Sequence, residues 1–213
     1  MKYTQLLTPL VALALAMIMT GCSGDKFGQV EQGRVVSFDK EKNEMAVVHD
    51  SAMDQNNPLY DVVPAEVFKL PLVNSEMGPE PAVGQRLKVD ADKKVIVIYD
   101  LVTQNLVEVP MIDPDLQKSI GNDHPLVFDA DTGTAKTFPV IDQANKKITI
   151  YSGRQKLLCT CSLPDEFFNE TRYPPSTWVA GDDVRIYYKK DEQAAVSQAL
   201  RIMNVSKTNI YRR

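Results

Sequence analysis

Cys159 and Cys161 are the residues best suited to chemistry in the body of this chain. A third cysteine, Cys22, lies near the N-terminus. Side chains two residues apart on a strand share one face, with Cα atoms about 6.6 Å apart, close to the upper limit for a disulfide. Such thiols can fill a core as small apolar groups, form a strained disulfide, or act as a metal or redox site. The third reading has the least support, because neither a histidine nor a C-x-x-C pair accompanies them.

Other residue patterns that carry catalysis are sparse. The two histidines, His49 and His124, are not spaced from each other or from the cysteines as metal ligands usually are. Haem attachment would need a C-x-x-C-H motif, which does not occur. The G-x-S-x-G and H-E-x-x-H motifs and the phosphate-binding glycine loop are also absent from the sequence. We therefore expect no cofactor, no catalytic residues and no enzyme activity.

Aromatic residues are concentrated toward the C-terminal end of the chain, where they could contact a ligand. Tyr187 and Tyr188 are neighbours on a predicted strand and point to opposite faces, so one of them is expected in the core and one at the surface. Trp178 is predicted to lie on the loop before this strand. Exposed aromatic rings stack on sugars or peptides, and we predict that Trp178 and Tyr188 contact a ligand or partner. Ordinary loop packing is the alternative.

The N-terminal residues have the layout of an export signal. Lys2 is followed by an apolar run over residues 6–19, and Met19-Thr20-Gly21-Cys22 places small residues directly before a cysteine. The run is too short to span a bilayer about 30 Å thick, which needs about 20 apolar residues. The segment resembles the signal peptide of a bacterial lipoprotein, in which Leu usually stands where this chain has Met19.

This resemblance implies a processing event and an address. Residues 1–21 would be removed as a signal peptide, and Cys22 would carry a diacylglycerol at the start of a lipidated tether, residues 22–28. Several acyl chains anchor far more firmly than one, because each buried methylene contributes about 0.8 kcal/mol. Ser23 stands where an Asp would retain such a protein at the inner membrane, so the resemblance implies the periplasmic face of the outer membrane.

The remaining composition excludes one class of partner. The chain is mildly acidic, with a formal net charge of −4. Its basic residues form pairs such as Lys189-Lys190, whereas nucleic-acid binding needs clustered lysine and arginine. We expect no nucleic-acid partner, and beyond the N-terminal run no stretch approaches membrane-spanning length.

Three blocks of sequence occur twice in the same order, which indicates an internal duplication. They pair residues 35–48 with 138–151, 64–68 with 164–168, and 83–89 with 180–186. Each copy reads as three strands, a short helical turn that begins at a proline, and two further strands. That order is typical of an oligonucleotide/oligosaccharide-binding (OB) barrel.

We therefore predict an all-β fold with two five-stranded OB-like or SH3-like barrels in tandem. The first covers residues 29–103 and the second residues 134–213, and each is expected to fold alone. The linker between them, residues 104–133, is dense in proline, glycine and asparagine and is expected to be largely irregular. A single continuous β-sandwich is the alternative.

The function that these features favour is association. We predict a lipid-anchored protein of the bacterial cell envelope that acts as a non-catalytic binding or assembly component, with an envelope protein or a small ligand as its partner. The alternative is a periplasmic redox or metal-handling lipoprotein that uses Cys159 and Cys161.

Overall fold

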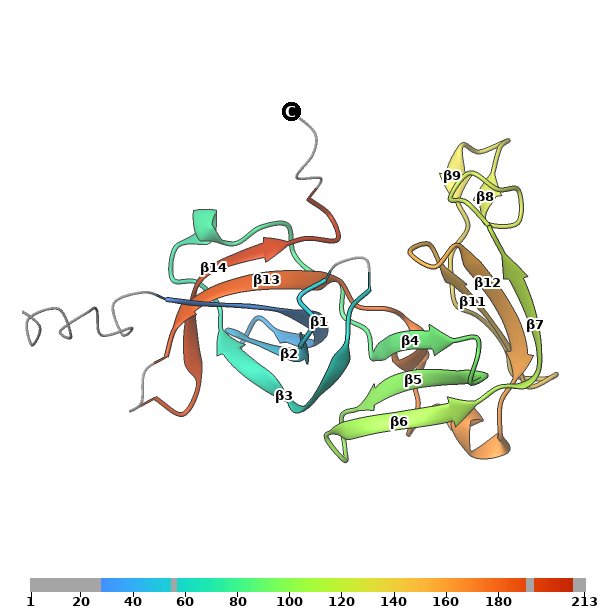
Figure 1. Ribbon diagram of the computed structural model, residues 1–213, viewed down its shortest axis with the longest axis horizontal. Coiled ribbons are helices and arrows are strands. Elements are labelled where there is room, and N and C mark those ends of the chain that lie inside the picture. The colour runs from blue at the N-terminus through green and yellow to red at the C-terminus, as the bar shows by residue number, and fades with distance from the viewer. Residues whose placement is uncertain (1–27, 55–56, 191–193, 209–213) are drawn as a thin grey trace, which may run out of the picture.

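The computed structural model describes residues 28–54, 57–190 and 194–208, and Figure 1 shows how their strands are arranged. The predicted signal peptide, Cys22 and all of the tether except Gly28 lie outside the described residues. The described chain consists of strands and short 3₁₀ helices, so the prediction of an all-β fold is confirmed. In these ranges no helix has the length and apolar character needed to cross a membrane.

Five strands close into a barrel, seen on the left of Figure 1. They are β1 (Gln29–Asp39), β2 (Glu44–Asp50), β3 (Tyr60–Lys69), β13 (Asp183–Lys189) and β14 (Ser197–Asn204). The order around the barrel is β1-β13-β14-β3-β2. β14 runs parallel to β3, and the other neighbours are antiparallel.

Alternation of apolar and polar residues explains how these strands fill the barrel. Successive side chains of a strand point to opposite faces, so Met45 and Val47 of β2 reach the same core as Val35 of β1. The rings of Phe68 and Tyr188 meet edge to face there, with centroids 5.1 Å apart. This core joins the first three strands of the described chain to its last two.

Two further sheets form the rest of the molecule, which we call the two-sheet unit. One contains β4 (Arg86–Asp90), β5 (Val95–Asp100) and β6 (Asn105–Pro110). The other contains β10 (Val140–Asp142), β11 (Lys147–Ser152), β12 (Leu157–Ser162) and β7 (Ile112–Lys118), in the order β10-β11-β12-β7. A small hairpin, β8 (Phe128–Asp129) and β9 (Thr134–Ala135), stands at one end.

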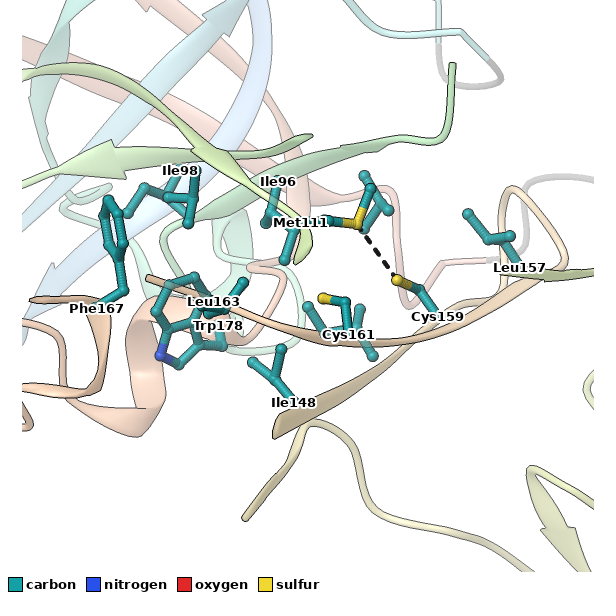
Figure 2. Close-up of a cluster of buried hydrophobic side chains, with 13 residues drawn as sticks. Ile96, Ile98, Met111, Ile148, Leu157, Cys159, Cys161, Leu163, Phe167 and Trp178 are labelled. Atoms are coloured by element: carbon teal, nitrogen blue, oxygen red, sulfur yellow. Dashed lines mark hydrogen bonds between the residues drawn. The ribbon is translucent and has the colours of Figure 1, made fainter. Parts of the chain in front are cut away.

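Side chains from both sheets share one core, part of which is drawn in Figure 2. Ile96 and Ile98 of β5 face Ile148 of β11 and Cys161 of β12 across it. Three 3₁₀ helices occur in the described residues: Asn74–Glu76, Asp165–Phe168 and Pro175–Trp178. The last two contribute Phe167 and Trp178 to this core.

The linker prediction is wrong for its first half. Residues 105–110 and 112–118, expected to be irregular, form β6 and β7. β6 pairs with β5, and β7 pairs with β12, on one side only. Proline is tolerated on strands whose other edge is free, because its missing N–H is not needed there, which explains how Pro110 and Pro114 fit.

The predicted domain boundaries do not separate the two units. The barrel takes β1 to β3 from the first repeat and β13 and β14 from the second. The two-sheet unit takes β4 and β5 from the first repeat and β10 to β12 from the second. Two contiguous barrels at 29–103 and 134–213 are therefore not what the chain forms. Residues 134–213 lack the strands that complete either core.

The two repeats exchange their last two strands at a point where two equivalent glycines lie against each other. Gly84 and Gly181 occupy matching positions of the duplicated blocks. A Cβ atom on Gly181 would lie 2.1 Å from the carbonyl oxygen of Val35, and one on Gly84 would lie 2.2 Å from that of Val179. No side chain fits at such distances. The two chain segments can cross here only because both positions are glycine.

Candidate functional site

A pocket of about 290 Å³ lies where the barrel meets the two-sheet unit. Its wall contains Arg34 of β1, Tyr60 of β3, Arg86 and Lys88 of β4, and Arg154 of the turn between β11 and β12. These residues come from segments that are far apart in the sequence, and the crossing of the two repeats brings the segments together.

Asp183, at the start of β13, is the carboxylate that organises this region. It is buried, and it accepts hydrogen bonds from Nε and Nη2 of Arg34, each 3.0 Å long. The hydroxyl of Tyr60 donates to it at 2.6 Å, and Arg154 forms a further ion pair with it. Burial acts to raise the pKa of Asp183, but Arg34, Arg154 and Tyr60 outweigh it and hold that pKa below its ordinary value.

Arg34 also joins the two units mechanically. Its Nη1 donates to the carbonyl oxygens of Arg86 and Leu87 on β4, at 3.3 and 3.0 Å. Its guanidinium stacks over the ring of Tyr60, 4.9 Å from the centroid. All of its nitrogens therefore have partners within the protein, and its role is to fix the pocket wall.

Arg86 differs from Arg34 because no carboxylate among the described residues pairs with it. Its side chain donates to the carbonyl oxygens of Trp178, at 2.9 Å, and Tyr151, at 3.4 Å. The residue is only 7% exposed. Burial, together with the like charge of Arg34, lowers the pKa of Arg86. A buried cation without a counterion is costly, so this wall of the pocket favours an anion.

The charges around the pocket do not cancel. Two guanidinium groups, those of Arg34 and Arg154, pair with the carboxylate of Asp183, and the guanidinium of Arg86 adds a third positive charge to the pocket wall. Two other charged residues in the wall already have partners: Lys88 lies 3.3 Å from Asp90, and Asp182 lies 3.2 Å from Lys207. The pocket therefore carries an excess of positive charge in a partly desolvated space, where electrostatic attraction is stronger than in water.

The structure places the two predicted thiols elsewhere. Cys159 and Cys161 are free and buried in the core of the two-sheet unit, on the same face of β12. The Sγ atom of Cys159 donates to Sδ of Met111 at 3.4 Å (Figure 2). The described residues contain no group of three histidine, cysteine or acidic side chains that could hold a metal ion.

The two predicted aromatic contacts are corrected by the structure. Trp178 and Tyr188 are each 3% exposed, so neither ring is available for stacking on a ligand. Trp178 packs against Phe167 and Tyr173 in the two-sheet unit. Tyr188 points into the barrel, where its hydroxyl donates to Glu31 at 2.6 Å, and Tyr187, 38% exposed, is the surface residue of the pair.

The two histidines lie apart from both sites. His49 pairs with Glu31 at 2.8 Å, and the Nδ1 atom of His124 accepts a hydrogen bond from the amide of Leu126. Neither residue lines the pocket.

The arginines of the pocket were missed because each stands alone in the sequence. One signal was present: within the duplicated blocks, Arg86 occupies the position equivalent to Asp183. The structure brings both positions to Arg34, which donates to the carboxylate of Asp183 and to the backbone carbonyl of Arg86.

Comparison with known proteins adds a family and no activity. No curated protein and no solved structure matches the chain. One family, described as Domain of unknown function (DUF4881), matches residues 26–213, which include every residue that the structure describes. The chain is a member of the DUF4881 family.

Proposed function

We propose that this protein is a non-catalytic binding component of the bacterial cell envelope, held to the membrane by a lipid on Cys22. Its ligand is a small anion that carries a carboxylate or phosphate group and occupies the pocket between the barrel and the two-sheet unit. The observation that carries the proposal is the buried cation Arg86, which lines this pocket and has no carboxylate partner among the described residues.

The size and chemistry of the pocket favour a compact ligand. About 290 Å³ lies at the lower end of the range for small-molecule sites. Arginine presents several N–H donors in one plane, which suits the paired oxygens of carboxylates and phosphates. Arg86 at the back of the pocket and Arg154 and Lys88 nearer its opening would bind the ligand from different sides.

The barrel fits the same proposal. Three strands of one repeat followed by two of the other reproduce the order of a five-stranded OB-like barrel, and we propose that description for it. OB barrels bind ligands on a sheet face and its loops. Here the ligand would instead lie against the second unit, because the crossing of the repeats builds the charged pocket there.

Anion binding can be measured directly by isothermal titration calorimetry at low salt. We expect the full chain carrying Cys22→Ser to bind at least one of inorganic phosphate, succinate and citrate. Arg86→Gln should weaken this binding about tenfold or more, since a hydrogen bond to a charged group contributes about 1.5 to 3 kcal/mol. Added salt should weaken it as well, because mobile ions screen the attraction.

Two further variants make the result decisive. Arg201→Gln removes one positive charge from an exposed surface pair outside the pocket and should leave binding unchanged. Lys88→Gln, at an exposed position on the pocket wall, should keep the fold and weaken binding less than Arg86→Gln does. Equal affinities for all four proteins, or no heat with any of the three anions, would show that the arginines serve only to join the two units.

The anchor has its own test in a bacterial host. Cys22→Ala should leave an uncleaved precursor and abolish labelling by an alkyne fatty acid, because the thiol is the acylated atom. The unchanged protein should be labelled and should partition with membranes. Labelling of the alanine variant at the level of the unchanged protein would contradict the proposal. Cys159→Ala, which removes a buried thiol, is the matched control and should keep the label.

A further inference from the structure

Three sulfur atoms meet inside the two-sheet unit. Cys159 and Cys161 reach the core from β12, and Met111, between β6 and β7, reaches it from the facing side (Figure 2). The Sγ of Cys159 lies 3.4 Å from Sδ of Met111, and Cys159 and Cys161 lie two residues apart on β12 and reach the same core. All three side chains are buried among Ile, Leu and Val residues.

We propose that Met111, Cys159 and Cys161 form a binding site for a single Cu(I) ion. The site lies in the core of the two-sheet unit, and none of its three ligands lines the pocket between the barrel and the two-sheet unit.

The set of donors selects the metal. Thiolate and thioether sulfurs are soft ligands that favour Cu(I), whereas Zn(II) sites are usually four-coordinate and use cysteine, histidine or carboxylate ligands. No group of three histidine, cysteine or acidic residues exists in the described part of the chain to supply such a site. Two thiols and one thioether instead provide the three sulfurs of a trigonal Cu(I) site.

The spacing of the Cys159 and Met111 sulfurs is compatible with this geometry. Metal–thiolate bonds are about 2.3 Å long, so the sulfurs of a trigonal site lie about 4 Å apart. Cys159 and Met111 are separated by 3.4 Å, and Met111 is an unbranched side chain that adjusts readily. An entering ion needs to move these sulfurs apart by only a fraction of an ångström.

Loading of the site balances in atoms and in charge. Binding breaks the two S–H bonds, forms Cu–S bonds to both thiolate sulfurs and to the thioether, and releases two protons, with no change in oxidation state. A Cu(I) ion with two thiolates and a thioether carries one negative charge.

The test is an anaerobic Cu(I) titration of the reduced chain carrying Cys22→Ser, which leaves Cys159 and Cys161 as its only thiols. Competition with the chromophoric chelator bicinchoninate measures affinity, and near-ultraviolet absorbance reports Cu–thiolate bonds. We expect one Cu(I) per chain, loss of both reactive thiols and a higher thermal unfolding midpoint, because a ligand that binds only the folded state stabilises it.

Variants of similar volume separate coordination from packing. Met111→Leu should weaken Cu(I) binding about tenfold or more, since it removes one ligand and keeps the core filled. Met45→Leu, the matched change in the barrel core, should leave binding unchanged. Cys161→Ala should abolish the absorbance. The proposal would be overturned if the two methionine changes had equal effects on Cu(I) affinity, or if Zn(II) bound as tightly as Cu(I). It would also be overturned if Cys159 and Cys161 formed a disulfide that resists reduction and excludes Cu(I).

Discussion

Replacing Gly181 by alanine is expected to lower the free energy of unfolding by about 3 kcal/mol or more. The new Cβ would lie 2.1 Å from the carbonyl oxygen of Val35 and 3.0 Å from the amide nitrogen of Gly84. Both neighbours are backbone atoms in the crossing of the two repeats, so neither can rotate away. Chemical denaturation of the full chain, followed by tryptophan fluorescence, measures the loss, because Trp178 is buried in the two-sheet unit.

Gly121→Ala is the matched control for this change. Its Cβ would meet only the carboxylate oxygen of Asp123, at 2.8 Å, and that side chain can move aside. The stability of this variant should stay within about 1 kcal/mol of the original. If Gly181→Ala were as stable as Gly121→Ala, the close crossing of the repeats would be wrong.

Asp183→Asn is expected to destabilise the protein by about 3 to 5 kcal/mol, because it leaves the buried cation of Arg34 without its counterion. The shape of the side chain is nearly unchanged, so the loss reports charge and hydrogen bonding. Arg34 would lose an ion pair made through two 3.0 Å contacts, and Arg154 would lose its carboxylate partner as well. Urea denaturation at neutral pH measures the effect.

The pH dependence of this loss has a defined sign. The pKa of Asp183 is held below its ordinary value in the folded state, whereas an unfolded aspartate titrates at about 3.9. The carboxylate therefore stabilises the fold fully above that pH and loses its effect as the pH falls through the lower, folded pKa. The stabilities of the original chain and of Asp183→Asn should converge in acid. Asp165→Asn, at an exposed position, is the control, and its free energy of unfolding should equal that of the original chain at every pH. If the free energies of unfolding of the original chain and of Asp183→Asn differed by the same amount from neutral to acid pH, the ion-pair account would be contradicted.

Local sequence patterns predicted most strands but not their partners. Alternation identified the positions of β1, β2, β11 and β12, because each has one face in a core. The block that opens the last two strands is duplicated, residues 83–89 with residues 180–186, so the sequence does not show which half of the molecule each pair of strands completes. Which pair is used depends on the crossing at Gly84 and Gly181, and the positions of two glycines in separate blocks do not reveal that they touch.

The pocket could not be predicted from the sequence for a related reason. Arg34, Arg86 and Arg154 are isolated arginines in the sequence, and a single arginine in a strand or turn is most often solvated. They become a site only when β1, β4 and the turn after β11 are brought together. The aromatic prediction was wrong for Tyr188 because alternation shows that two neighbouring tyrosines face opposite ways without showing which of them faces the core.

The exchange of strands between the repeats also sets the order of events in folding. Arg34 and Asp183, which pair in the finished barrel, are separated by 149 residues, so the first strand of the barrel cannot be completed until almost the whole chain is available. Contacts of such long range slow folding, because the entropy of closing the loop must be overcome first. Until then β1, β2 and β3 have exposed edges, which are prone to pair with other chains. We therefore expect a nascent or truncated chain, whose strand edges lack their partners, to aggregate more readily than the complete chain.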